Sequence, residues 1–289
     1  MVWKRARVAH LTLDLAGPED GPLALCLHGF PDVPSTFHGL GRCLAAQGYR
    51  VALPFLPGYA PSPRLARADL ESVAGALMAL ADALCPQRRV VLVGHDWGAA
   101  VAYTLAALRP ERVAALVSLA VPHPRAFAST WLRSARQRRM SAYMLAFQLP
   151  FSALALARDD FAPVGRLWRR WSPGLSVDRE HMERVKRCLR QSAGAPLDYY
   201  RHGALPLRPA LRRLRRLGSV PWQLPTLHLH GMDDGCMSPE AAHASASLLG
   251  EWGQIEVLPG VGHFLHLERP EEVEKRVLRF VAQRTRDTG

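Results

Sequence analysis

Short apolar runs alternate with longer helical patterns through about the first 120 residues. Apolar runs of roughly four to eight residues between turn residues are typical of buried strands, and apolar positions three or four apart are typical of helices. This alternation predicts an α/β fold in which helices cover both faces of a mostly parallel central sheet. The predicted strands are 8–15, 23–27, 51–53, 89–93 and 112–119, and the predicted helices are 69–84, 99–108 and one that ends near Gly48.

The alternation stops at Pro122 and resumes near residue 226. Between these points the pattern is helical, rich in arginine and interrupted by prolines at positions 150, 163, 173 and 196, which predicts an inserted helical lid. We expect residues 1–121 and 219–289 to form one core and residues 122–218 to form the lid, with a ligand between the strand ends and the lid. The later predicted elements are strands 226–230 and 254–258, and helices 239–249 and 270 to about 283.

Composition narrows the possible partners. A chain of 289 residues with 48% hydrophobic residues can bury a full core. No apolar run approaches the roughly 20 residues of a membrane span, and residues 1–7 lead into no signal-peptide pattern. We therefore expect a cytoplasmic protein without a membrane span, either a monomer or a homodimer.

The net charge of +12 raises the question of nucleic acid, because basic proteins bind phosphate. Lysine occurs at only three positions while arginine is abundant, which indicates a compositional bias. The densest basic stretches, 133–139 and 208–216, lack the interleaved aromatic residues of single-strand binders. We interpret both as solvated helix faces and expect no nucleic-acid partner.

The cysteines are scattered and have neither the CxxC nor the Cys/His spacing of zinc sites. We expect no disulfide, no metal and no cofactor. The five positions are Cys26, Cys43, Cys85, Cys188 and Cys236.

The segment Gly94-His-Asp96-Trp-Gly98 lies between a predicted strand and a predicted helix. Gly-x-nucleophile-x-Gly in this context is the layout of a nucleophile elbow, whose glycines permit close backbone approach. Asp96 would stand at the strand end, near a helix N-terminus that favours an anion. A carboxylate can attack a saturated carbon, as in an epoxide or alkyl halide, and leave an ester that water hydrolyses. The alternative is that Asp96 merely caps the helix beginning at Trp97.

The segment His28-Gly-Phe30-Pro31 follows the strand 23–27, where one oxyanion-hole N–H is expected. The second donor is the N–H of the residue after the nucleophile, so the sequence predicts the backbone amides of Phe30 and Trp97. His28 and His95 are expected to be structural. The predicted pocket residues are His28, Phe30, Pro31, Trp97 and Phe147.

A histidine can activate water against an ester on Asp96 only if a carboxylate fixes its tautomer. The segment 231–239 after the strand 226–230 offers Asp233 and Asp234, and we prefer Asp234; the other aspartate could cap the helix at Pro239. His263 and His266 both follow the strand 254–258. The Gly-His junction directly after a strand favours His263 as the base.

Together these motifs resemble those of the epoxide hydrolases of the α/β-hydrolase fold, in the branch with an aspartate nucleophile. The resemblance covers nearly the whole chain and implies that fold, with a helical lid, and an epoxide substrate with water as co-substrate. Its motifs are HGFP at 28–31, LPGYAPS at 56–62, GHDWG at 94–98, GMDDG at 231–235 and GHFLHLERP at 262–270.

Two lid stretches, 141–150 and 197–201, resemble those that carry the two lid tyrosines of this family. The resemblance implies that Tyr143 and Tyr200 point at the epoxide oxygen, whereas Tyr199 packs. Ring opening develops an alkoxide, which needs hydroxyl donors to leave. The stretch 53–59 departs from the family, because an aspartate and an arginine are more usual there, and so does Ala60, where glycine is commoner. These departures weaken inferences about the substrate but leave the triad unaffected.

The resemblance implies a hydrolase that opens epoxides to vicinal diols through an ester on Asp96, with a biological role in either detoxification or biosynthesis. A haloalkane or haloacid dehalogenase could use the same aspartate, and Trp97 could offer its indole N–H to a halide. Phe30 stands where dehalogenases often have an asparagine, which disfavours that alternative. A ligand-binding protein without catalysis would be expected to lack a triad member, and none is missing.

Overall fold

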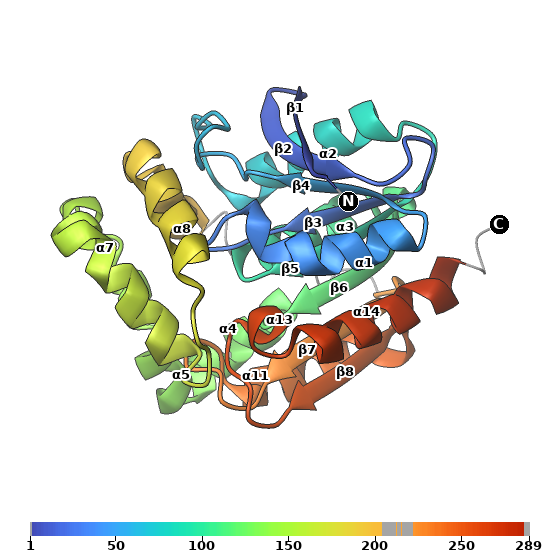
Figure 1. The fold of residues 1–289 in the computed structure, drawn as a ribbon. Helices are drawn as coiled ribbons and strands as arrows, with labels where there is room; N and C mark the ends of the chain where they lie inside the picture. Colours follow the sequence, from blue (N-terminus) through green and yellow to red (C-terminus); the bar gives the residue numbers. More distant parts are fainter. Residues whose placement is uncertain (1, 204–211, 213–214, 216–221, 286–289) are drawn as a thin grey trace.

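The computed structural model describes residues 2–203, 212, 215 and 222–285. Within them, eight strands form one sheet in the order β1-β2-β4-β3-β5-β6-β7-β8 (Figure 1). The β1–β2 and β2–β4 pairs are antiparallel and the other neighbouring pairs are parallel, which confirms the predicted mostly parallel sheet. The strands are β1 (Lys4–Val8), β2 (Leu11–Ala16), β3 (Leu23–Leu27), β4 (Arg50–Pro54), β5 (Val90–His95), β6 (Val113–Leu119), β7 (Thr226–Gly231) and β8 (Gly253–Leu258).

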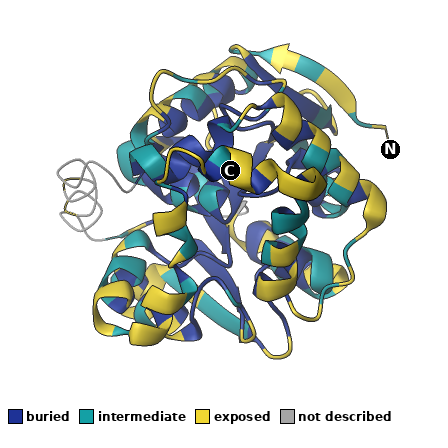
Figure 2. Ribbon diagram, turned by 90° about the vertical axis from the view of Figure 1, so that its left-hand side faces the viewer, coloured by how far each residue is buried: buried dark blue, intermediate teal, exposed yellow. Residues whose placement is uncertain are grey.

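The prediction of one strand over 8–15 is wrong, because the chain reverses there. Ala9 and His10 have positive φ values of 46° and 67°, and Val8 pairs with Leu11 across this two-residue turn. Such hairpin turns usually contain Asn or Gly, so the sequence lacked the usual signal. The resulting strand β1 is a largely exposed sheet edge (Figure 2), and its charged residues suit an edge that must not pair further.

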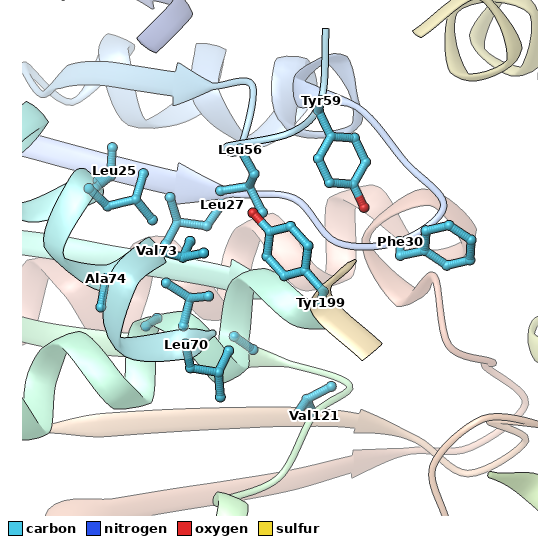
Figure 3. Packing of buried hydrophobic residues seen from close by; sticks show 14 of the residues in the cluster. Leu25, Leu27, Phe30, Leu56, Tyr59, Leu70, Val73, Ala74, Val121 and Tyr199 are labelled. Atoms are coloured by element: carbon cyan, nitrogen blue, oxygen red, sulfur yellow. The ribbon is translucent and has the colours of Figure 1, made fainter. Parts of the chain in front are cut away.

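Successive side chains of the central strands point to opposite faces of the sheet, so each face carries its own apolar layer. Leu25 and Leu27 of β3 pack toward Leu70 and Val73 of α2 (Figure 3), while Cys26 belongs to the layer on the other face. The helices α2 and α3 thus cover one face, and α1 and α14 cover the other. The core helices are α1 (His38–Ala46), α2 (Leu70–Leu84), α3 (Trp97–Leu108), α11 (Pro239–Ala244), α12 (Ala246–Leu249), α13 (Leu265–Glu268) and α14 (Pro270–Thr285).

The predicted helices agree with these elements except for 239–249, which is divided at Ser245 into α11 and α12. Asp69 caps α2, accepting a hydrogen bond from the Ser72 N–H. Short 3-10 turns connect several elements: η1 (Pro34–Phe37), η2 (Pro110–Arg112), η3 (Ala195–Leu197) and η4 (Gly250–Trp252).

The described residues between β6 and β7, here called the helical insertion, contain helices and no strand. They lie beyond one end of the sheet (Figure 1). The residues 158–161 interrupt α7 with non-helical backbone angles. The helices are α4 (Pro124–Arg133), α5 (Ala135–Met140), α6 (Tyr143–Ala146), α7 (Ser152–Trp171), α8 (Arg179–Gln191) and α9 (Asp198–Gly203).

The arginines of the basic stretch 133–139 are exposed on α4 and α5, as predicted. Of the stretch 208–216, only Arg212 and Arg215 are described, and both are exposed. The predicted lid boundary at 218 lies outside the described residues. None of the described helices is long and apolar enough to cross a membrane.

Candidate active site

Asp96 occupies the sharp turn between β5 and α3. Its φ of 50° and ψ of −122° are uncommon for a residue other than glycine. The side chain forms no capping hydrogen bond with α3, although Asp96 is the residue before that helix. The alternative that Asp96 merely caps the helix is therefore wrong. The Asp96 side chain is buried and faces the neighbouring loops.

Three glycines are required at this turn and in the loop against it because other atoms approach where a Cβ would stand. A Cβ on Gly98 would lie 2.0 Å from the Leu27 carbonyl oxygen, and one on Gly94 would lie 2.5 Å from Ala99 Cα. A Cβ on Gly29 would lie 2.3 Å from the Asp96 Cβ. The loop after β3 can therefore lie directly against the Asp96 side chain.

This contact brings the two predicted oxyanion donors close to Asp96. The Phe30 N–H donates a 2.7 Å hydrogen bond to Asp96 Oδ1. Trp97 directly follows Asp96 and is the first residue of α3, where a backbone N–H has no intrahelical acceptor. Asp96 Oδ1 is thus held by the Phe30 amide, while Oδ2 faces His263.

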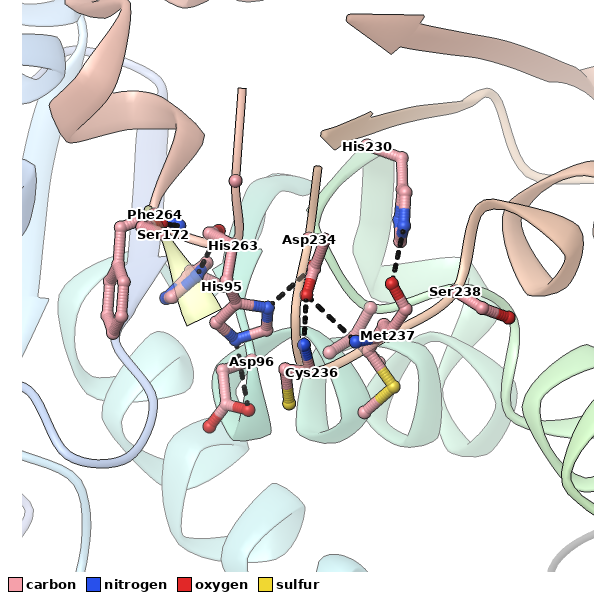
Figure 4. A network of polar contacts seen from close by, with 12 residues as sticks. His95, Asp96, Ser172, His230, Asp234, Cys236, Met237, Ser238, His263 and Phe264 are labelled. Atoms are coloured by element: carbon pink, nitrogen blue, oxygen red, sulfur yellow. Dashed lines mark hydrogen bonds and ion pairs between the residues drawn. The ribbon is translucent and has the colours of Figure 1, made fainter. Parts of the chain in front are cut away.

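His263 and Asp234 complete a buried triad with Asp96 (Figure 4). His263 Nδ1 lies 2.8 Å from Asp234 Oδ2, and Nε2 lies 3.5 Å from Asp96 Oδ2. Asp234 Oδ1 accepts hydrogen bonds from the N–H groups of Cys236 and Met237, at 2.6 and 2.8 Å. The acid is therefore fixed at both oxygens, and it orients the imidazole toward Asp96.

The charges of this triad depend on one another. Burial disfavours a charged imidazole, but the carboxylates of Asp234 and Asp96 outweigh it and raise the pKa of His263 to about 10. Burial acts against ionisation of Asp234 too, yet His263 outweighs it and the pKa of Asp234 is lowered. The resting site therefore holds an imidazolium between two carboxylates at neutral pH.

The alternative acid and base lie elsewhere. Asp233 is exposed and is not the cap of α11, which begins after Ser238 without a side-chain cap. His266 Nε2 lies 2.6 Å from Thr36 Oγ1, so this nitrogen is already bonded away from Asp96. The geometry favours Asp234 and His263.

The histidines expected to be structural contact backbone groups. His28 Nε2 accepts a hydrogen bond from the Leu56 N–H at 3.2 Å, and its Nδ1 lies 3.0 Å from the Gly29 carbonyl oxygen. His95 Nε2 lies 3.0 Å from the His263 carbonyl oxygen. His28 thus holds the loops beside the pocket, and His95 supports the segment that carries His263.

The helical insertion contributes an aromatic wall in front of Asp96. The Tyr200 ring centroid lies 5.0 Å from that of Trp97, 5.4 Å from that of Phe30 and 4.9 Å from that of Phe147. The Tyr143 ring lies 5.8 Å from that of Tyr200. The predicted pocket and proton-donor residues Phe30, Trp97, Tyr143 and Phe147 are thus gathered around Tyr200.

The two phenols differ in their partners. Tyr143 Oη lies 3.3 Å from Cys236 Sγ, whereas the buried Tyr200 hydroxyl faces the side chains of Trp97 and Tyr143. Burial raises the pKa of both phenols well above the ordinary value for tyrosine, so both are neutral proton donors. Tyr199 donates to the Pro57 carbonyl at 2.9 Å, which agrees with its predicted packing role.

Pro31 contributes its backbone to the junction between core and insertion. Its carbonyl accepts a 3.1 Å hydrogen bond from Trp168 Nε1 of α7. Residues 30 and 31 are joined by a cis peptide bond. The loop that carries the Phe30 donor is therefore tied to the insertion.

Two residues at the site were missed from the sequence. Cys236 offers a sulfur that lies within 4.8 Å of ligand atoms of Asp96 and His263. Its position two residues after Asp234 was an available signal. Trp171 accepts a 2.9 Å hydrogen bond from the His263 N–H, and its ring lies 5.0 Å from that of Tyr143. No sequence pattern indicated this contact.

Comparison with known proteins identifies the family of the chain. Over residues 22–270 the chain matches the family described as alpha/beta hydrolase fold, and it belongs to that family. An epoxide hydrolase of Caballeronia sordidicola is 30% identical over 292 residues, spanning 90% of this chain and 88% of the relative. Within the family, the chain therefore belongs with the epoxide hydrolases.

Two further proteins support this grouping. Epoxide hydrolase 4 of Homo sapiens is 28% identical over 285 residues, spanning 94% of this chain and 75% of the relative. A solved structure described among novel epoxide hydrolases from metagenomes of hot environments has a TM-score of 0.80 and 26% identity, covering 97% of this chain and 98% of that one.

Proposed function

We propose that this chain hydrolyses epoxides to vicinal diols through a covalent ester on Asp96. The observation that carries the proposal is the placement of two neutral phenols, Tyr143 and Tyr200, on the aromatic wall facing an aspartate nucleophile. Alkoxide departure requires a proton, and departure of a halide does not. The names of the relatives agree with an epoxide substrate.

In the first step, Asp96 Oδ2 attacks one epoxide carbon. This oxygen is the one that faces His263, since Oδ1 accepts the Phe30 N–H. The carbon–oxygen bond of the epoxide breaks, and its electron pair stays on the epoxide oxygen. That oxygen takes a proton from Tyr143 or Tyr200. A hydroxyalkyl ester and a phenolate result.

Ester formation prepares His263 for the second step. It removes the negative charge of Asp96, which is one of the two carboxylates that hold the imidazolium. The pKa of His263 then falls, and its proton passes to the phenolate. The neutral imidazole, still oriented by Asp234, is now a base for water.

Water then attacks Asp96 Cγ and gives a proton to His263. The oxyanion forms on Oδ1, where the Phe30 N–H already donates and the Trp97 N–H can join. Collapse breaks the Cγ–Oδ2 bond, and the alkoxide takes the proton from His263. The new carboxylic acid returns its proton to His263, which restores the resting charges. The diol therefore leaves with the original Oδ2.

An isotope experiment tests this route. In a single turnover with excess enzyme in ¹⁸O-water, the diol should contain unlabelled oxygen from Asp96, and the label should appear in a peptide containing Asp96. Label in the first-turnover diol would mean direct attack by water and would refute the covalent route.

The dehalogenase alternative is tested separately. A panel of chloroalkanes and chloroacids is compared with aryl, terminal alkyl and fatty-acid epoxides. We expect diol from at least one epoxide and no chloride release. Chloride release without diol formation would assign the aspartate to dehalogenation instead.

We also propose that residues 122–218, which include the helical insertion, form a lid. This lid completes the pocket over a core formed by residues 1–121 and 219–289. A role in detoxification, a cytoplasmic location and a monomeric or homodimeric state remain predictions of the same scheme. The screen of epoxide classes bears on the role, because detoxification predicts a broad substrate range.

A further inference from the structure

A second cluster of ionisable groups lies behind the active site. Asp32, His95 and His266 each offer one ligand atom, and these atoms lie within 4.8 Å of one another. Asp32 follows β3, His95 ends β5 and His266 belongs to α13. All three residues are buried, with exposed fractions of 0%, 0% and 6%.

Each of the three residues has one buried polar atom without a hydrogen-bond partner in the described part of the chain. These atoms are Asp32 Oδ2, His95 Nδ1 and His266 Nδ1. An isolated unpaired polar atom in a protein interior is costly. Three in one buried cluster indicate that a ligand absent from the protein chain satisfies them.

The remaining polar atoms of the same side chains are all used. His95 Nε2 faces the His263 carbonyl, which can only accept, so Nε2 carries the hydrogen and Nδ1 presents a lone pair. His266 Nε2 faces Thr36 Oγ1 at 2.6 Å. Outer contacts of this kind orient histidines that bind metals.

Asp32 is held in the same way. Its Oδ1 accepts the Val33 N–H at 2.8 Å and lies 2.7 Å from His181 Nε2 of α8. Only Oδ2 is left for the cluster. The available atoms are thus one carboxylate oxygen and two imidazole nitrogens from three separate elements.

The tautomer of His266 decides which ligand this set suits. With the Thr36 hydroxyl accepting from His266 Nε2–H, both imidazoles present lone pairs, and a water, which donates only two hydrogens, cannot satisfy them together with the carboxylate oxygen. With that hydroxyl donating, His266 Nδ1 carries the hydrogen and one water satisfies all three atoms, so the metal titration below decides between the two ligands. Two imidazoles and one carboxylate are common ligands of first-row divalent metals. The charge of Asp32 would also be balanced by a cation.

The cluster lies next to the protein surface. A surface cleft of about 360 Å³ lies between α1, the segment before α8 and the α13–α14 corner. Thr36, His181 and His266 are among the residues that line it. His266 belongs to the cluster, and Thr36 and His181 contact its members, so the cleft borders the cluster on the side away from Asp96.

We propose that Asp32, His95 and His266 bind one first-row divalent transition-metal ion, such as Zn²⁺ or Co²⁺. The ion is structural: it fixes His95 beneath the His263 carbonyl and Asp32 beside α8 of the insertion. The second candidate group, Asp96, Cys236 and His263, belongs to the active site and is a competing location that the experiment must distinguish.

The test is a titration of the metal-free full-length protein with Co²⁺, followed by visible absorption and calorimetry. We expect one equivalent to bind, with the weak absorption bands of nitrogen and oxygen ligation, and the thermal midpoint to rise because the ion binds the folded state. Asp32→Asn and His266→Gln should weaken binding by about tenfold or more. The matched control is His243→Gln, which removes an exposed histidine of α11 and should change nothing.

Three results would overturn the proposal. One is a sulfur-to-cobalt charge-transfer band that Cys236→Ser removes, since it places the ion in the active site. Another is equal weakening in His243→Gln, which indicates adventitious surface binding. The third is a crystal of the wild-type protein soaked in Zn²⁺ with no anomalous peak between Asp32 and His266. The soaked crystal decides the question even if the variants do not fold.

Discussion

The core and the helical insertion hold their parts of the site by different means. On the core, Asp96, Asp234 and His263 follow β5, β7 and β8, and their oxygens and nitrogens are bonded at 2.6–2.8 Å to backbone or to one another. On the insertion, Tyr143 and Tyr200 belong to the short helices α6 and α9 and are placed mainly by ring contacts near 5 Å.

This difference assigns the nucleophile and base to the core and the proton donors for the leaving group to the insertion. Backbone geometry at strand ends determines the nucleophile and the base, because the close contacts at Gly94 and Gly98 leave little freedom. Side-chain packing in the insertion determines what can donate to the leaving group. We infer that substitutions in the core should stop the reaction, whereas substitutions in the insertion should slow one step.

The largest effect is expected from Asp96→Asn. The amide is a poor nucleophile, so steady-state diol formation should fall by at least about 10⁴-fold. Substrate depletion and diol yield measure it, with circular dichroism to check the fold. Slow recovery of activity with mass loss to the aspartate form would indicate deamidation. A variant that stays Asn and keeps more than one tenth of the rate would contradict the assignment of the nucleophile.

His263→Gln separates the two steps. Asp96 should still be alkylated, but ester hydrolysis should slow by about 10³-fold or more because no base activates water. Intact-protein mass spectrometry should detect protein heavier by one substrate molecule. If no adduct accumulates and diol formation continues, His263 is not the base. His243→Gln, which removes an exposed histidine of α11, is the control, and it should not accumulate the adduct.

Substitution of the phenols tests the insertion. Tyr143→Phe and Tyr200→Phe should each slow alkylation by about 10²- to 10³-fold, since each removes one donor to the forming alkoxide. Ester hydrolysis, measured after the burst, should change less. Tyr199→Phe is the matched control, because its hydroxyl donates to Pro57. Equal effects of all three variants would mean that the phenols act through packing.

The core could be predicted well because its signals are local. The apolar runs in the sequence predicted most strands correctly. The Gly-x-Asp-x-Gly spacing predicted the close backbone contacts at Gly94 and Gly98, on either side of Asp96. The hairpin at residues 9 and 10 was missed because Ala and His replace the usual turn residues. A single apolar run cannot distinguish one strand from two short strands without such a signal.

The helical insertion could be predicted less well because its contacts join distant segments. The same holds for the cluster of Asp32, His95 and His266, here called the rear cluster. The Tyr143 phenol contacts Cys236, and the rear cluster joins residues 32, 95 and 266, so no spacing in the chain reveals either. The resemblance to a family pointed to the two tyrosines. It did not indicate Cys236 or Trp171. The spacing of the cysteines carries no information about Asp32, His95 and His266, because none of these residues is a cysteine.

The pH dependence of stability tests the coupling within the core. Burial disfavours the imidazolium of His263, but Asp234 and Asp96 raise its folded pKa to about 10, above the unfolded value near 6.5. The stabilisation is therefore complete below about pH 6.5 and is lost as the pH rises through about 10. Denaturant unfolding should detect this loss, and the stability difference between wild type and Asp96→Asn should shrink over that window. A difference that is constant with pH would mean that Asp96 and His263 are not coupled.

The smallest effect is expected at the link between the core and α9. Asp198, buried at the start of α9, accepts 2.7 Å contacts from the guanidinium of Arg64, whose side chain is 61% exposed. Because water screens an exposed partner, Arg64→Ala should cost only about 1 kcal/mol of stability. It should also slow alkylation a few-fold by releasing the helix that carries Tyr200. Arg67→Ala is the control: Arg67 lies in the same loop, but its partner is Asp69 of the core. If Arg67→Ala slows alkylation as much as Arg64→Ala does, then side-chain links do not position the insertion.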